Sequence, residues 1–249
     1  MTGDPHARTV TAQAVTGQTQ AMTGDPHALV RLLQLASPAL PIGAYSYSQG
    51  LEWAVEAGVV RDAATAQAWL GDLLVHVQAE GEAAVLARLT AAAESGDWQA
   101  FVRWNAWFRA SRESAELVAE TVQMGGSLVK LLADLDVLDD PARAAVAADP
   151  PVTLPAAFAL AARALRVPVA GVVTGYLWSW LENQVLAAIK LVPLGQVAGQ
   201  KLLLALGGEV PAAAARARAI ADDDVTSFAP GLALASIRHE TQYSRLFRS

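Results

Sequence analysis

Few residues in this chain have the types and spacing that catalysis or metal binding requires. His76 and Glu80 lie four apart in an apolar stretch that predicts helix, so they share one face. Two ligands alone make a weak metal site, and we favour a hydrogen-bonded histidine packed at the edge of the core. Asp222–Asp224 could contact a divalent cation, but a solvated acidic helix start is the simpler interpretation. Neither feature predicts an active site by itself.

The common catalytic and nucleotide-binding motifs are missing. The sequence has no Gly-x-x-x-x-Gly-Lys-Ser/Thr, no Gly-x-Gly-x-x-Gly after a strand and no Gly-x-Ser-x-Gly. The lack of cysteine excludes disulfides, thiolate metal sites and cysteine nucleophiles. We therefore predict that the chain is not an enzyme. A site assembled from distant residues, such as Ser46, His76 and His239, stays open as an alternative.

The composition favours a helical protein that is partly covered by other proteins. Charged residues make up 17% of the chain and apolar residues 53%, with a net charge of −6. That balance argues against a nucleic-acid binder, which needs Lys and Arg to displace counterions from phosphates. The longest uncharged run, residues 32–51, contains two prolines, and the run 167–181 is too short to span a membrane. We expect no membrane segment and a cytoplasmic location.

Apolar residues recur at spacings of three and four along nearly the whole chain, which predicts helices. No segment alternates with period two, so we expect an all-α fold, a single helical domain of about nine or ten helices with no sheet. Gly125 and Gly126 lie inside one predicted helix, where close packing or a bend would explain them. The main predicted helices cover residues 46–57, 62–95, 112–135, 155–165, 168–191, 193–206 and 211–221, and another begins after Asp97.

The first residues contain a repeat, because residues 1–7 recur as residues 22–28. The intervening Thr/Gln/Ala stretch has almost no large apolar residue, so we predict a disordered extension over residues 1–28. A metal site formed by His6 and His27 is the alternative, and Met22 is a candidate natural start. The helical domain is then expected over residues 29–237, with a partner-binding tail over residues 238–249.

Three stretches break local rules without a catalytic reason. They read Ser-Pro-Ala-Leu-Pro-Ile-Gly-Ala-Tyr-Ser-Tyr-Ser-Gln-Gly-Leu-Glu over residues 37–52, Tyr-Leu-Trp-Ser-Trp-Leu-Glu-Asn-Gln from residue 176 with Ala-Ile-Lys-Leu-Val-Pro-Leu-Gly from residue 188, and the tail Arg-His-Glu-Thr-Gln-Tyr-Ser-Arg-Leu-Phe-Arg-Ser. In this order they resemble the F-type urease accessory proteins, the UreF family. The resemblance covers residues 29–249.

The resemblance implies an all-helical, non-enzymatic homodimer. Members of the family join the D/H-type accessory protein (UreD/UreH) and the GTPase accessory protein UreG on apo-urease, and help nickel to reach the active site. No cofactor is expected on this chain, because nickel is handled by the complex. A helical nickel-binding carrier is the alternative. Four histidines without a cluster, and no cysteine, argue against tight nickel binding by this chain alone.

The resemblance also points to residues that bind partners. It implies that the tail becomes ordered on the D/H-type partner and that Lys190 affects the fidelity of GTP-dependent activation. Tyr and Arg are typical of binding hot spots, and the tail offers both. Glu52 and Glu56 lie one helical turn apart, so their repulsion hints at a partner opposite them. The predicted partner-binding residues are Tyr45, Tyr47, Glu52, Tyr176, Glu182, Lys190, Arg238, His239, Tyr243, Arg245, Leu246, Phe247 and Arg248.

Overall fold

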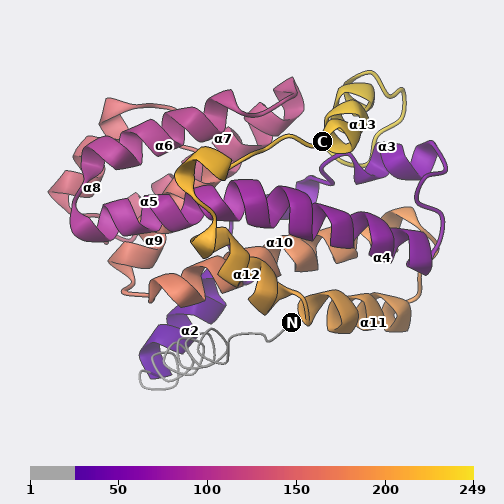
Figure 1. The fold of residues 1–249 in the computed structure, drawn as a ribbon, viewed down its shortest axis with the longest axis horizontal. Coiled ribbons are helices and arrows are strands. Elements are labelled where there is room, and N and C mark those ends of the chain that lie inside the picture. Colours follow the sequence, from indigo (N-terminus) through magenta and orange to yellow (C-terminus); the bar gives the residue numbers. More distant parts are fainter. Residues whose placement is uncertain (1–25) are drawn as a thin grey trace, which may run out of the picture.

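The computed structural model describes residues 26–249, and its fold is all-α, as predicted (Figure 1). None of the described residues forms a strand. His6, the start-site prediction at Met22 and all of the repeat except residues 26–28 lie outside the described part of the chain, and residues 26–28 are helical. The predicted division into an extension, a domain and a tail stays a prediction.

The first half of the described chain contains one long helical rod. Helix α2 spans Pro26–Leu35 and the short α3 spans Leu51–Glu56. The rod consists of α4 (Ala63–Asp72), the π-helix η2 (Leu73–Glu82) and α5 (Ala83–Ser95) without a break. Asp62 caps it as predicted, because its carboxylate accepts the backbone N–H of Thr65 at 2.8 Å. Gly96, in the left-handed region, ends it.

Four helices follow, and side-chain caps set the start of the first three. These are α6 (Trp98–Ala110), α7 (Ala115–Asp134), α8 (Asp140–Ala148) and α9 (Leu154–Ala164). Asp97 caps α6 as predicted. Helix α7 begins at Ala115 rather than at Arg112, because the Ser114 hydroxyl accepts the backbone N–H of Leu117 at 3.1 Å.

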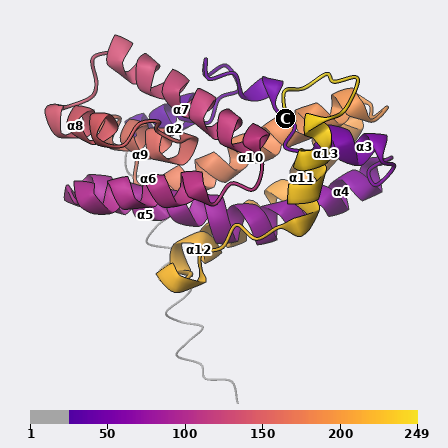
Figure 2. The ribbon, with the colours of Figure 1, turned by 90° about the horizontal axis from the view of Figure 1, so that it is seen from above.

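Helix α10 (Val169–Leu191) forms the centre of the molecule. It contacts α2, α3, α5, α9, α11 and α12, so its near-continuous apolar sequence is explained by burial on most sides (Figures 1 and 2). Helices α11 (Gln196–Gly207) and α12 (Val210–Ala219) pack beside it. Helix α13 (Pro230–Glu240) instead packs against α3 and α7.

The two adjacent glycines of α7 have different surroundings. A Cβ on Gly125 would lie 2.3 Å from the carbonyl oxygen of Val152 and 2.6 Å from the carbonyl carbon of Thr153, just before α9. A Cβ on Gly126 would meet nothing within 4 Å. Close packing therefore requires glycine at the first position and not at the second.

Two local predictions need correction. Helix α3 begins at Leu51 rather than near Ser46, because the carbonyl of Ser46 and the backbone N–H of Ser48 bond to residues 248 and 249 instead of continuing a helix. Positive φ angles at Gln49 and Gly50 separate that segment from the helix. His76 is exposed rather than packed at the core edge, and its ring lies 3.8 Å from Glu80 on the same face of η2.

Candidate partner-binding site

The three stretches that break local rules converge in the fold. The indole N–H of Trp180 on α10 donates to Gln49 at 2.7 Å, which joins the second stretch to the first. Asn183 donates from its amide to the carbonyl oxygen of Tyr47 at 3.2 Å. The tail reaches both, since Arg248 donates its backbone N–H to Ser46 and the Lys190 ammonium lies 5.5 Å from the Phe247 ring centroid.

The carboxylate of Glu52 holds the tail on the body of the protein. It accepts the backbone N–H of Leu246 at 2.6 Å and that of Phe247 at 2.8 Å. A carboxylate that accepts two neighbouring amides makes charge-assisted bonds, which are stronger than neutral ones. Glu52 is buried, whereas Glu56 is exposed. The repulsion between them therefore does not need an external partner, because Glu52 is paired within the chain.

His239 lies between two carboxylates. Its Nδ1 is 2.7 Å from Glu116 on α7 and its Nε2 is 3.2 Å from Glu52 on α3. The ring has no exposed surface. The guanidinium of Arg245 binds the other oxygen of Glu116 at 2.8 Å. The set links α13, α3, α7 and the tail in one polar cluster.

A second buried carboxylate, Glu120 of α7, holds the last described residue. Its two oxygens accept the Gln49 amide at 2.7 Å and the Ser249 hydroxyl at 2.8 Å. Burial raises the pKa of Glu120 to about 7, against the lowering effect of these two bonds. Nearby Glu82 raises it further.

Tyr176 lies on the interior side of this polar region. Its hydroxyl donates to Glu82, whose other oxygen lies 3.4 Å from the Arg112 guanidinium. Burial, followed by the charge of Glu82, raises the pKa of Tyr176 well above its ordinary value. The phenol therefore stays neutral and serves as a donor to the carboxylate.

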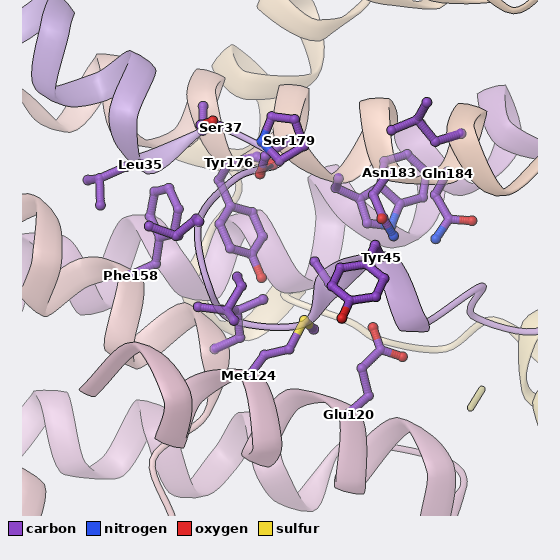
Figure 3. Close-up of a pocket in the computed structure, with 18 of the residues that line it drawn as sticks. Leu35, Ser37, Tyr45, Glu120, Met124, Phe158, Tyr176, Ser179, Asn183 and Gln184 are labelled. Atoms are coloured by element: carbon purple, nitrogen blue, oxygen red, sulfur yellow. Dashed lines mark hydrogen bonds between the residues drawn. The ribbon is translucent and has the colours of Figure 1, made fainter. Parts of the chain in front are cut away.

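A mostly apolar cavity of about 90 Å³ lies beside this region, under the segment between α2 and α3 (Figure 3). Tyr45, Glu120 and Tyr176 line it together with Gln184 of α10. The side-chain oxygen of Gln184 is buried and has no hydrogen-bond partner. The cavity is large enough for several water molecules, which would satisfy that oxygen.

The predicted partner-binding residues fall into two groups. Five are buried within the chain, so a partner cannot reach them in this conformation: Tyr47, Glu52, Tyr176, His239 and Phe247. Seven are exposed: Tyr45, Lys190, Arg238, Tyr243, Arg245, Leu246 and Arg248, while Glu182 is partly buried and burial raises its pKa. The tail lies on its own chain here rather than extending freely. The assignment of all these residues to partner binding stays a prediction.

Sequence reasoning missed three residues that hold the site together, namely Gln49, Glu116 and Glu120. One signal was available for Glu120, which shares the apolar stripe of α7 with Leu117, Met124 and Leu128 at spacings of three, four and eight. A carboxylate on an apolar stripe requires a buried partner. No pattern pointed to Gln49 or Glu116, because the partners of Gln49 lie on α7 and α10 and those of Glu116 lie at the end of α13 and in the tail.

Residues 26–249 contain neither a candidate metal site nor a candidate membrane-spanning helix. No group of three or more His, Cys, Asp or Glu side chains is placed to hold a metal ion. No helix in this range is both long enough and apolar enough to cross a membrane.

Comparisons with known proteins show which family the chain belongs to. The chain matches the family model UreF over residues 60–207. It is 57% identical over 224 residues to the urease accessory protein UreF of Azoarcus sp. (strain BH72), covering 89% of this chain and 95% of that protein. It is 53% identical over 225 residues to the protein of the same name from Dechloromonas aromatica (strain RCB), covering 89% and 97%. The all-α fold is thus found in a chain whose relatives are accessory proteins.

The chain belongs to the UreF family. The matches extend beyond the matched core of residues 60–207, because the aligned portion is 89% of the chain. The resemblance inferred from the three stretches is therefore confirmed.

Proposed function

We propose that this chain acts in urease maturation as a non-enzymatic scaffold, which joins the D/H-type accessory protein and the GTPase accessory protein on apo-urease. The main support for this proposal is the sequence identity of 49 to 57% with proteins named urease accessory protein UreF, over 89% of the chain. The chain binds no cofactor of its own, works in the cytoplasm as a homodimer, and leaves nickel to the assembled complex.

The exposed part of the tail supports a docking role for the D/H-type partner. Tyr243 is fully exposed and Leu246 is 66% exposed, although both are large and partly apolar. Arg238, Arg245 and Arg248 are exposed in the same tail. Exposed aromatic and apolar side chains within a basic rim have the composition of a binding hot spot.

Capture of the purified partner tests this role. A Tyr243→Ala/Leu246→Ala variant removes the apolar anchors without touching a buried group, so its fold should be unchanged. We expect at least a tenfold loss of affinity for the D/H-type protein. Leu135→Ala is the matched control, because Leu135 is 52% exposed at the end of α7, outside the tail. Equal affinity of both variants and the parent would contradict the assignment.

Lys190 supports a separate contact, with the GTPase. It lies exposed at the last turn of α10 and next to Phe247, so a partner bound to Lys190 would lie beside the tail. We expect Lys190→Ala to reduce the dependence of urease activation on GTP, with the complex still assembled. Lys201→Ala, an exposed lysine on α11, serves as control. An unchanged GTP dependence in Lys190→Ala would remove this residue from the site.

The scaffold and the nickel-carrier hypotheses differ in one measurable property. Calorimetric titration of nickel into the purified chain should give no submicromolar site if the complex, rather than this chain, holds the metal. A submicromolar site would favour the carrier.

A further inference from the structure

The cavity beneath residues 37–45 contains a polar atom that has no partner within the protein. The side-chain oxygen of Gln184, on α10, lines this space of about 90 Å³ and accepts no hydrogen bond (Figure 3). The residue is only 1% exposed, so bulk water does not reach it. Leaving a buried acceptor without a donor is unfavourable. The cavity therefore favours an occupant that donates a hydrogen bond at this point.

The two carboxyl groups that line the same cavity already have partners. Glu82 accepts the hydroxyl of Tyr176, and its other oxygen lies 3.4 Å from the guanidinium of Arg112, which compensates its charge. The two oxygens of Glu120 accept hydrogen bonds at 2.7 and 2.8 Å. Burial also raises the pKa of Glu120 to about 7, so this group is partly protonated at neutral pH. A neutral donor fits these surroundings better than a cation, whose burial costs more.

Apolar side chains form much of the remaining wall of the cavity. They come from the end of α2, from α7 and from α9, and include Leu35, Ala36, Met124, Leu154 and Phe158. A buried water molecule needs two or more polar partners, and these side chains offer none. An apolar group placed against them leaves bulk water and gains van der Waals contacts. The occupant that suits the whole cavity thus has an apolar body and one hydrogen-bond donor.

The volume of the cavity limits the size of that occupant. An apolar cavity of about 150 Å³ in an unrelated protein holds benzene, which has six non-hydrogen atoms. The same ratio gives about four non-hydrogen atoms for the cavity of about 90 Å³ in this protein. A three-carbon alcohol has this size, an apolar body and a single donor.

The segment over residues 37–45, which covers the cavity, is folded through local hydrogen bonds. The backbone N–H of Leu40 donates to the carbonyl of Ser37 at 3.0 Å, and that of Ile42 donates to the carbonyl of Leu40 at 2.8 Å. Tyr45 lines the cavity although it is 67% exposed, so the wall reaches the protein surface at this residue. The local bonds can be kept while the segment moves outward and admits a ligand.

We propose that this cavity is a binding site for a small neutral molecule of the alcohol class, whose hydroxyl donates to the side-chain oxygen of Gln184 and whose apolar body packs against the side chains of α7 and α9. The site lies within one chain and needs no partner protein. It is therefore independent of the proposed role in urease maturation, and a failure to bind the ligand would leave that role untouched.

Three ligands of equal size separate the chemical requirements of the site. 2-Propanol donates a hydrogen bond, acetone only accepts one, and isopropylammonium donates but carries a positive charge. Each is titrated into the full chain labelled with ¹³C at the methionine methyl groups, and the Met124 methyl reports binding because it lines the cavity. We expect 2-propanol to bind with a dissociation constant on the order of 1 mM. Acetone and isopropylammonium should bind at least about tenfold more weakly.

A variant at position 184 tests the role of the unpaired oxygen. Gln184→Met removes this acceptor and keeps a side chain of nearly the same length, so 2-propanol and acetone should then bind with affinities within about twofold of each other. Gln200→Met, at an exposed position of α11, is the matched control and should keep the preference for 2-propanol. A Met124→Leu variant identifies the Met124 methyl signal in the spectrum.

The absence of a saturable shift of the Met124 signal with 2-propanol, up to about 100 times the expected dissociation constant, would overturn the proposal, because the cavity would then hold water only. Equal binding of acetone and 2-propanol to the parent protein, or tighter binding of isopropylammonium, would overturn it as well. These comparisons use the parent protein, so they remain decisive if Gln184→Met does not fold. A folded Gln184→Met that still prefers 2-propanol would refute the assigned role of Gln184.

Discussion

The adjacent glycines of α7 allow one packing prediction to be worked out with an internal control. Alanine at position 125 would place a Cβ 2.3 Å from the Val152 carbonyl oxygen and 2.8 Å from that of Thr153. Both obstacles are backbone atoms at the start of α9, so neither can rotate away. Overpacking of this kind costs about 1 to 3 kcal/mol, and more when backbone must shift.

The intrinsic preference of helices partly offsets that cost. Replacing glycine by alanine inside a helix stabilises it by about 1 kcal/mol. We therefore expect Gly125→Ala to destabilise the protein by about 2 kcal/mol. Gly126→Ala, which meets nothing within 4 Å, should stabilise it by about 1 kcal/mol. The two variants have the same composition, so their difference of about 3 kcal/mol reports the packing alone.

Thermal unfolding followed by circular dichroism measures both variants. For a chain of this length, about 3 kcal/mol corresponds to a difference in melting temperature of about 6 to 12 °C, with Gly126→Ala the higher. Equal midpoints for the two variants would refute the close approach of α7 to the residues before α9. A midpoint of Gly125→Ala above that of the parent would do so as well.

Three further predictions concern polar groups that are buried or partly buried. The pKa of Glu120 is raised to about 7 from an ordinary 4.5, so its contribution to stability is complete below pH 4.5 and is lost as pH rises to 7, by up to about 3 kcal/mol. Urea unfolding of the parent and of Glu120→Gln at pH 5 and 8 checks this prediction. Parallel changes of stability with pH in both proteins would contradict it. Asn105→Ala leaves the backbone N–H and hydroxyl of Thr153 without their acceptor, at 2.9 Å each, and should cost about 2 to 4 kcal/mol. Asn183→Ala, which loses a single bond to Tyr47, should cost about 1 kcal/mol in the same assay.

The all-α class and most helix bounds could be predicted because local signals determine them. Asp62 and Asp97 are caps that can be recognised in the sequence, and α10 is apolar over nearly its whole length. The start of α3 is an exception. Residues 46–50 look like the start of a helix, but the carbonyl of Ser46 and the backbone N–H of Ser48 bind residues 248 and 249, about two hundred positions away. A local pattern carries no information on such a partner.

The candidate site could be predicted only in outline. The three unusual stretches can be recognised by their composition, and the structure brings them together, because Asn183 of the second bonds to Tyr47 of the first and Glu52 of the first bonds to Leu246 of the third. Their individual roles could not be predicted, because exposure depends on how the tail folds back. His239 and Phe247 look like tail residues in the sequence, yet both are buried, whereas Tyr243 between them is fully exposed.

The central claim is that this chain supports urease maturation without catalysing a reaction itself. The most direct measurement is urease activity, normalised to the amount of urease protein, in a urease-positive strain that lacks its own UreF. The account predicts normal urease protein with almost no activity in that strain, and activity restored when this chain is expressed. Unchanged activity without any UreF, or failure of the folded, expressed chain to restore it, would contradict the account.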